Sequence, residues 1–304
     1  MRKRIDAHVH ITPATALGKK NPRFDTENLP YGRLRMGDGG FYTMPCYIHD
    51  SQFTADTLVN MMDVYGVEKA VIMQSLMSPQ NEDVARAVER WPERLVGAMV
   101  IEPVGDWRAE MAAWQRRGLR VIKFEMRAYT DPNCYPDLRY DDETMTALFD
   151  EAQQLGLTIT VDPAPVDFPV YGPDAFATAV RRHPDAHFVL CHLGYPLPVD
   201  TPECYRRWQA MVDAANQPNC WVDVSAMPDF FDAEGWPYPT AHKLLAEVKA
   251  KLGAQKLIWG TDITGTLNRA TYPQMIEMFE RSGVLTDREL DALFYDNAAA
   301  AYQL

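Results

Sequence analysis

The segment I5-D-A-H-V-H-I11 places two histidines two residues apart in an apolar run that is typical of a β-strand. Because successive side chains of a strand point to opposite faces, His8 and His10 are predicted to share one face with Asp6. Burying such a face is unfavourable unless its groups are paired or bind a ligand, and neutral imidazoles are common metal ligands. We therefore predict that His8 and His10 bind a metal. The opposite face, which would pack against outer helices, would consist of Ile5, Ala7, Val9 and Ile11.

The elements that would position this pair alternate regularly along the chain. Short runs rich in apolar and β-branched residues predict eight strands, at 5–11, 69–75, 95–101, 119–125, 157–162, 186–192, 220–225 and 256–262. Apolar residues spaced three and four apart predict helices between them, for example at 54–66, 82–91, 142–156 and 241–253. A doubly wound open sheet is the competing architecture, but no G-x-G-x-x-G follows the first strand. The pattern therefore predicts an α/β fold, a TIM (β/α)8 barrel, with residues 1–304 forming a single domain.

The connections that leave the strands are much longer than those that enter them. They span roughly residues 12–53, 126–140, 193–202 and 226–239. In a TIM barrel such loops lie at the C-terminal end of the strands, where active sites are built. We expect 12–53 to form a long insertion loop over the barrel mouth, where its aromatic residues serve as a lid, as packing or as a subunit contact. A homo-oligomer, most simply a dimer, is expected on that basis.

Ionisable residues stand at the C-terminal ends of several other predicted strands. Asp162, His192 and Asp262 end strands five, six and eight, and Lys123, Glu125 and Arg127 alternate along and beyond strand four. Singly, each has a structural alternative, such as a helix cap, a satisfied core histidine or an internal ion pair. Together they would converge on one mouth, as a metal-assisted site requires.

Composition restricts the partners and the compartment. The net charge of −12 argues against nucleic acid, which needs a basic surface. No apolar run is long enough to predict a membrane span, and the N-terminus lacks the apolar core of a signal peptide. The five scattered cysteines contain no Cys-x-x-Cys pair, which favours a reduced, cytoplasmic environment. The expected partner is a small molecule.

Several of these stretches together resemble the amidohydrolase superfamily, in particular the branch containing aminocarboxymuconate-semialdehyde decarboxylase and the resorcylate-type decarboxylases. The matching stretches span nearly the whole chain: I5-DAHVHI-11, V121-IKFE-125, F188-VLCHLGYP-196, L257-IWGTD-262 and Y295-DNAAAAYQL-304. The resemblance implies one divalent metal, most often zinc, bound by His8 and His10. Asp262 would complete the site or accept a proton from water, and His192 would act as a general acid and base.

Strand five departs from the pattern of this branch. Many relatives place a metal-binding histidine there, whereas this chain has Asp162 in T158-ITVDPAP-165. Asp162 is therefore either a fourth metal ligand, which would favour a harder ion such as manganese, or a group that faces the substrate. The neighbouring branch includes metal-independent lactonases, so a metal-free lactonase is an alternative. Some relatives carboxylate a strand-four lysine to bridge two metals, which gives Lys123 another possible role.

These features lead to one principal function and three alternatives. The first expectation is metal-dependent hydrolysis of a small carboxylated molecule by activated water, with Asp262 and His192 as catalytic residues. Non-oxidative decarboxylation would need cationic groups for a carboxylate, for which Arg127 is a candidate, while Arg33 and Arg35 are expected to be solvated. A metal-independent lactonase and a non-catalytic binding barrel are the others. In each case the expected substrate contacts are Lys123, Glu125, Arg127 and Tyr195.

Overall fold

A single parallel sheet of eight strands organises the molecule. The computed structural model describes residues 2–131 and 134–304. The strands pair in chain order, which confirms all eight predicted strands, although most end earlier than predicted. They are β1 (Ile5–Val9), β6 (Lys69–Ile72), β7 (Leu95–Met99), β8 (Leu119–Glu125), β9 (Thr158–Asp162), β10 (Phe188–Leu190), β11 (Cys220–Asp223) and β12 (Leu257–Ile258).

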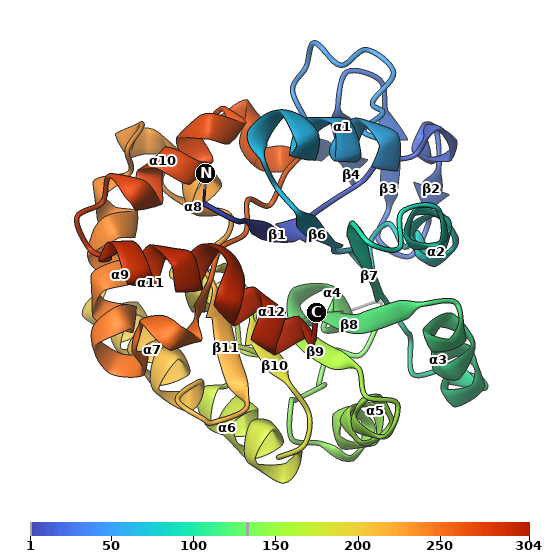
Figure 1. Cartoon of the computed structure of the whole chain (residues 1–304). Helices are drawn as coiled ribbons and strands as arrows, with labels where there is room; N and C mark the ends of the chain where they lie inside the picture. Colours follow the sequence, from blue (N-terminus) through green and yellow to red (C-terminus); the bar gives the residue numbers. More distant parts are fainter. Residues whose placement is uncertain (1, 132–133) are drawn as a thin grey trace.

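Backbone hydrogen bonds between the first and last strands close this sheet into a ring (Figure 1). The amide of Ala7 donates to the carbonyl of Trp259 at 3.1 Å, and the amide of Asp262 donates to the carbonyl of His8 at 2.7 Å. A parallel bridge joins Val9 to Ile263 just beyond. This closure confirms the TIM barrel and brings the end of the eighth strand beside the two N-terminal histidines.

A ring of helices covers the outside of the barrel, one or more after each strand. The main helices are α1 (Ala55–Tyr65), α2 (Asn81–Arg90), α3 (Trp107–Arg116), α5 (Glu143–Gln154), α6 (Pro173–Arg182), α7 (Pro202–Ala214), α9 (Pro239–Leu252) and α10 (Tyr272–Glu280). In α1 the side chain of Thr54 accepts the amide of Thr57, and Gly66 ends the helix in a left-handed conformation. The same helix buries Leu58 and Met62 against the sheet. Local caps and an apolar face therefore both define this helix.

A β-bulge in β1 alters the predicted distribution of its side chains. The pairing of β1 with β6 shifts register between Asp6 and Val9. As a result Ile5 and Ala7 pack inside the barrel, whereas Val9 packs with the helices. Asp6 points outward, where its carboxylate accepts the Tyr272 hydroxyl at 2.7 Å at the start of α10. The prediction that Asp6 shares a face with the histidines, and that four apolar residues share the other, is wrong because the bulge inserts one extra residue.

The N-terminal end of the barrel is filled by apolar side chains and closed by the C-terminal helix α12 (Asn297–Tyr302), which crosses the ring in Figure 1. Ala298, Ala301 and Tyr302 belong to the same buried cluster as residues from β1, β6, β7, β8, β10 and β12. The side chain of Thr158 also donates to the carbonyl of Ala301 at 3.0 Å. α12 follows α11 (Asp287–Asp291) and a π-helical turn, Ala292–Asp296. This end of the barrel is therefore a packed apolar core.

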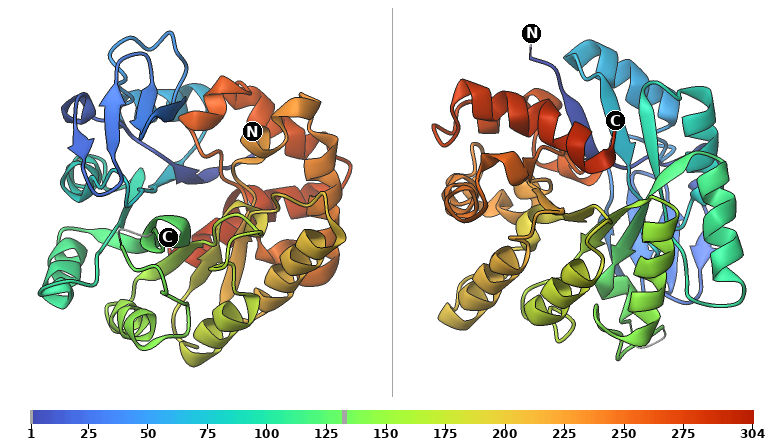
Figure 2. Two further views of the ribbon diagram at one scale, coloured as in Figure 1. Left: turned by 180° about the vertical axis from the view of Figure 1, so that it is seen from behind. Right: turned by 60° about the horizontal axis from the view of Figure 1, so that its bottom comes forward.

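Residues 12–53 contain a small antiparallel sheet as well as loops. Its strands β2 (Lys20–Asn21), β3 (Thr26–Leu29), β4 (Arg33–Met36) and β5 (Gly39–Tyr42) pair in sequence order. A hairpin at Gly37 and Asp38 joins β4 to β5, and Gly37 has a φ of 55°, as such tight turns require. Seen from behind, this blue segment stands at one edge of the barrel mouth (Figure 2). The predicted insertion loop at 12–53 therefore contains four short ordered strands.

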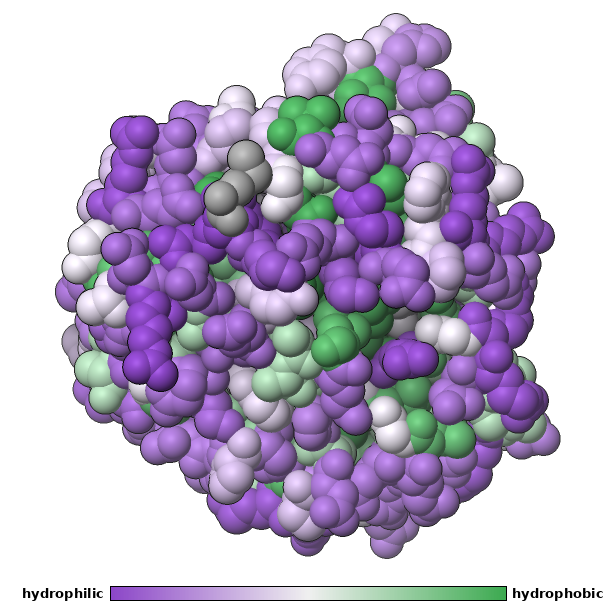
Figure 3. Space-filling view, in the orientation of Figure 1, coloured by the Kyte–Doolittle hydropathy of each residue, from purple (hydrophilic) through white to green (hydrophobic). Residues whose placement is uncertain are grey.

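The remaining short helices are α4 (Met126–Tyr129) and α8 (Met227–Phe230), which follow β8 and β11 at the barrel mouth. Elsewhere the face seen in Figure 3 is mainly hydrophilic, with small separate hydrophobic areas. None of the helices within residues 2–131 and 134–304 is both long and apolar enough to cross a bilayer. The apolar surface is instead buried between the sheet and its helices.

Candidate active site

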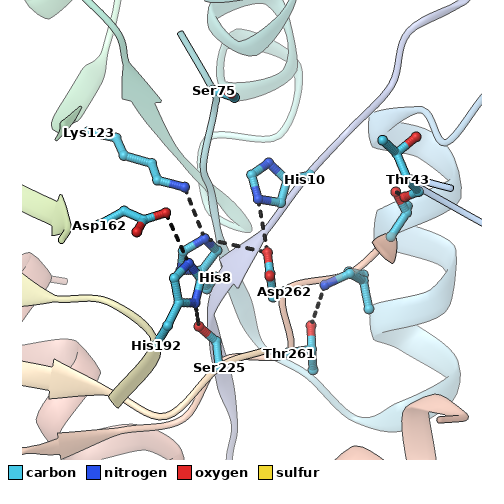
Figure 4. A network of polar contacts seen from close by, with 12 residues as sticks. His8, His10, Thr43, Ser75, Lys123, Asp162, His192, Ser225, Thr261 and Asp262 are labelled. Carbon is cyan, nitrogen blue, oxygen red and sulfur yellow. Dashed lines mark hydrogen bonds and ion pairs between the residues drawn. The ribbon is translucent and has the colours of Figure 1, made fainter. Parts of the chain in front are cut away.

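A cavity of about 540 Å³ lies at the C-terminal ends of the strands. Its walls bring together nearly all of the residues that the sequence predicted for the site: His10, Lys123, Glu125, Arg127, Asp162, His192, Tyr195 and Asp262. His8 is fully buried and lies behind this wall, against His10 and His192 (Figure 4). The insertion contributes Phe41, Tyr42 and Thr43 to the rim.

Both ring nitrogens of His8 face polar side chains. Nδ1 lies 3.0 Å from a carboxylate oxygen of Asp223, and Nε2 lies 3.4 Å from Nζ of Lys123 and 3.6 Å from Oδ1 of Asp262. Burial, together with the positive charge of Lys123, lowers the pKa of His8 to about 4. The ring is therefore neutral at pH 7 and presents a lone pair. Gly260 makes room for it, because a Cβ there would lie 2.8 Å from the Cβ of His8.

Asp262 faces both N-terminal histidines. Its Oδ1 lies 3.0 Å from Nε2 of His10, and its position is fixed by the barrel closure described above. Burial alone would raise the pKa of Asp262, but the hydrogen bond from His10 and the neighbouring imidazoles hold it well below its usual range. The donor atoms of His8, His10 and Asp262 all lie within 4.8 Å of one another. Two imidazoles and one ionised carboxylate at such spacing fit a divalent metal.

Asp162 faces His192, whose ring lies 4.6 Å from that of His8. The carboxylate Oδ2 lies 3.5 Å from Nε2 of His192. Burial opposes the charge on His192, but the bond to Asp162 and the surrounding carboxylates raise its pKa to about 9. Burial likewise opposes the charge on Asp162, and His192 holds the pKa of that carboxyl below its usual value. The two side chains therefore form an ion pair. This contact does not test whether Asp162 is a fourth metal ligand, and that role stays a prediction.

His192 is presented by an uncommon backbone turn. Residues His192, Leu193, Gly194 and Tyr195 all have φ between 54° and 73°. Consecutive left-handed residues are unfavourable by about 1–2 kcal/mol each for non-glycine residues. The turn is held by the Trp208 indole, which donates to the carbonyl of Leu193 at 2.8 Å, and by the Tyr171 hydroxyl, which donates to the carbonyl of Gly194 at 2.6 Å.

Lys123 and Glu125 bring opposite charges to the inner wall. Burial disfavours the charge on Lys123, but Asp162, Glu125 and Asp262 raise its pKa above the usual value. Burial raises the pKa of Glu125, whose carboxylate accepts the Ser75 hydroxyl at 2.5 Å. The surrounding carboxylates therefore favour the charged form of Lys123, and Glu125 is a carboxyl group that protonates more readily than usual.

Arg127 and Tyr195 line the outer part of the cavity. The guanidinium of Arg127 lies over the Phe168 ring at 5.8 Å and makes no ion pair with the residues that the structure describes. The Tyr195 ring lies 4.6 Å from that of Phe230, which forms an aromatic wall beside His192. Of the other two arginines considered, Arg35 pairs with Asp25 and Glu27, and neither it nor Arg33 lines the cavity.

The sequence analysis did not identify two residues of the site, which lie at the end of β11 and just after it. The carboxylate of Asp223 is fully buried and accepts from His8, from the amide of His192 and from the Ser225 hydroxyl. Ser225 also contacts Nδ1 of His192 at 2.8 Å. Asp229, from α8, lines the cavity as well, and burial raises its pKa to about 6. The signal was present in C220-WVDVS-225, where Asp223 and Ser225 have the same parity at a strand end.

The sequence profile of the Amidohydrolase family matches residues 5–304, so the chain belongs to the amidohydrolase family. It is therefore an enzyme of the amidohydrolase superfamily, as the resemblance predicted. No curated protein sequence matches the chain in a direct comparison.

Solved structures show the same fold at low sequence identity. A probable 2-pyrone-4,6-dicarboxylic acid hydrolase from Acinetobacter baumannii, with citric acid bound, has 16% identity and a TM-score of 0.72, with 99% of each chain covered. An amidohydrolase from Burkholderia multivorans with bound zinc has 17% identity, the same TM-score of 0.72 and 99% coverage of both chains. A 2,6-dihydroxybenzoate decarboxylase in complex with 2,6-dihydroxybenzoate has 17% identity and a TM-score of 0.57, covering 83% of this chain and 89% of its own.

Proposed function

We propose that the protein is a metal-dependent hydrolase of a small carboxylated molecule. The observation that carries this proposal is that His8, His10 and Asp262 each place one potential ligand atom within 4.8 Å of the other two at the barrel mouth. A divalent metal held by these three residues would supply Lewis-acid polarisation and ease the ionisation of water at neutral pH. Zinc suits two imidazoles and one carboxylate, and manganese is the alternative.

The side chains of this site have complementary roles in a hydrolysis. Asp262 is ionised and hydrogen-bonded to His10, so it can take a proton from an attacking water. His192 lines the cavity beside Asp162, has a raised pKa and can donate a proton to the leaving group or stabilise a developing oxyanion. Asp162 pairs with His192 and keeps its ring protonated in the resting site. The site therefore has a base and an acid in separate places.

Substrate binding would depend on the cations of the cavity. Arg127 lacks an ion pair among the described residues, so its guanidinium is available for a substrate carboxylate. Tyr195 and Phe230 offer a flat apolar wall nearby. The ligands named for two structural neighbours, citric acid and 2,6-dihydroxybenzoate, both carry carboxyl groups, which supports a carboxylated substrate.

A metal-independent hydrolase is the second candidate, and one observation favours it. The protonated amine of Lys123 lies 3.4 Å from Nε2 of His8, the atom that a metal would need. In that case Lys123 would supply the positive charge beside the attacked group, and Asp262 would still activate water. One of the structural neighbours is named as a pyrone dicarboxylic acid hydrolase, which fits either candidate.

Removing the metal with a chelator and then adding zinc or manganese back distinguishes the two candidate functions. Purified protein would be screened against carboxylated lactones and amides, with carbon dioxide detected in parallel, before and after chelation. Hydrolysis that disappears on chelation and returns with zinc or manganese supports the metal-dependent enzyme. Unchanged hydrolysis after complete metal removal, together with its loss in a Lys123→Met variant, supports the second candidate. Release of carbon dioxide without hydrolysis would overturn both.

A further inference from the structure

The buried carboxylate of Asp223 connects the two innermost histidines of the site. It accepts four hydrogen bonds, and their distribution over its two oxygens is uneven. Oδ2 faces Nδ1 of His8 at 3.0 Å, while Oδ1 accepts the backbone amide of His192 at 2.9 Å, the amide of Ser225 at 3.1 Å and the Ser225 hydroxyl at 2.5 Å. Two backbone amides and one hydroxyl donate to Oδ1, and such a set of donors around a buried group is the environment of a carboxylate that accepts with both oxygens.

Hydrogen-bond direction fixes the proton on His8. An ionised carboxylate can only accept, so the Nδ1 of His8 that faces Asp223 must carry the hydrogen. A second contact gives the same answer, because the Lys123 ammonium has only donors and lies 3.4 Å from Nε2 of His8. The neutral ring therefore carries its proton on Nδ1 and leaves the Nε2 lone pair toward Lys123 and Asp262.

The same carboxylate reaches His192 through Ser225. A serine hydroxyl has one hydrogen, and here it is donated to Asp223. The Ser225 oxygen 2.8 Å from Nδ1 of His192 must then act as the acceptor, so this nitrogen carries a hydrogen as well. The atom of His192 that faces the cavity and Asp162 is Nε2, at 3.5 Å from that carboxylate.

We propose that Asp223 is a positioning residue that holds a hydrogen on Nδ1 of both histidines, directly in His8 and through Ser225 in His192. Both rings then present Nε2 to the site. In His8 this nitrogen is the one available to a metal, and in His192 it is the one that exchanges a proton with a substrate. These two consequences depend on the proposed function, whereas the positions of the two hydrogens do not.

The geometry predicts two substitutions, each of which affects the ring hydrogens of only one of the two histidines. In Asp223→Asn the amide oxygen can replace Oδ1 and keep the bonds to His192 and Ser225. The amide nitrogen then replaces Oδ2 and donates to His8, which moves the His8 proton from Nδ1 to Nε2. Ser225→Ala leaves His8 unchanged but removes the acceptor for Nδ1 of His192. Ser225→Thr keeps a hydroxyl and should restore the wild-type state.

Long-range proton–nitrogen correlation spectra of the full, metal-free chain with labelled histidine test this directly. The signals are assigned by their loss in His8→Gln and His192→Gln, and Ser75→Ala is the matched control, because Ser75 bonds Glu125 and neither histidine. We expect a hydrogen on Nδ1 of both rings in the wild type. In Asp223→Asn this hydrogen should leave Nδ1 of His8 alone. In Ser225→Ala the Nδ1 signals of His192 alone should change chemical shift, because Nδ1 loses its acceptor while Asp162 keeps the ring protonated. If Asp223→Asn does not fold, the wild-type spectrum and the serine variants still decide the proposal.

A wild-type His8 with its hydrogen on Nε2, or a Ser225→Ala variant whose His192 signals match the wild type, would overturn the proposal. Metal affinity provides a second readout. Asp223→Asn is expected to bind zinc about 10–100-fold more weakly, as found when groups behind a metal ligand are removed. Because the spectra are recorded without metal, a failure of metal dependence would leave the assignment of the hydrogens intact.

Discussion

The two ends of the barrel interior differ sharply although the same strands build both. At the N-terminal end the interior is apolar, with residues such as Ile5, Val121 and Ile258 packed against Tyr302 of α12. At the C-terminal end, a few residues further along β1 and β8, His8 and Lys123 are buried among carboxylates. One end is stabilised by burial of apolar surface, whereas the other holds charges that are satisfied only by one another. We expect substitutions at the two ends to affect different properties.

The largest expected effect is at the polar end. Asp262→Asn keeps the shape of the side chain but removes the charge that faces His10, and should lower kcat about 10³-fold, the usual order for a general base. Steady-state kinetics would measure this, with thermal unfolding as a check on folding. Asp229→Asn is the matched control, since it removes another cavity carboxylate that has no contact with His10. Equal losses in both variants would contradict the special role of Asp262.

The next effect is at the apolar end. Tyr302→Ala should lower the free energy of unfolding by about 3–5 kcal/mol, because it opens a cavity beneath the barrel. The kcat of the remaining folded protein should stay within about twofold, because Tyr302 itself does not line the cavity. Urea unfolding and activity at low temperature measure the two quantities. A Tyr47→Ala control, at a side chain that is 81% exposed, should change stability by less than about 0.5 kcal/mol. A large loss of kcat in Tyr302→Ala would show that the two ends are coupled.

A smaller effect is expected at the outer wall. Arg127→Gln should raise KM for a carboxylated substrate about 10–100-fold, the equivalent of one charge-assisted hydrogen bond. Arg33→Gln should leave KM unchanged, because Arg33 does not line the cavity. An equal rise in both variants would point to a general electrostatic effect and away from a direct contact with Arg127.

The smallest expected effect is a pH dependence of stability, at most about 1.4 kcal/mol per pH unit for one proton. His192 has its pKa raised from 6.5 to about 9, so the folded chain binds this proton more tightly than the unfolded chain does. The stabilisation is complete below pH 6.5 and is lost as the pH rises toward 9. Urea unfolding of chelated protein across this range should show a decline that is flatter in His192→Gln. A parallel decline in the variant would assign the effect to other groups.

The sequence predicted which residues lie at the polar end better than it predicted the local backbone structure around them. The strand ends could be located because apolar, β-branched runs stop at ionisable residues, and eight of them are enough to imply a closed barrel. The bulge in β1 could not be predicted, because register depends on the partner strand β6, and it reversed the expected direction of Asp6. The pairing of β2 to β5 was missed for a related reason. Those strands are two to four residues long, and Gly39 and Gly40 give them no alternating pattern.

The polar network was only partly visible in the sequence. His10 and Asp262 could be paired because β1 and the end of the eighth strand must meet in a closed barrel. The contacts of Asp162 with His192 and of Asp223 with His8 depend on side-chain direction across the barrel, which no local pattern specifies. The left-handed turn at His192 was equally hidden, since only one of its four residues is glycine.

Elemental analysis of the purified chain tests the central claim most directly. The wild-type protein and a His187→Asn control, altered at a histidine that bonds the carbonyl of Ala301 at the opposite end, should each hold one equivalent of zinc or manganese. His10→Asn should hold little or none, and its hydrolytic activity should fall in proportion to the metal lost. Full occupancy in His10→Asn, or full activity in wild-type protein stripped of metal, would contradict a metal site built on His8, His10 and Asp262.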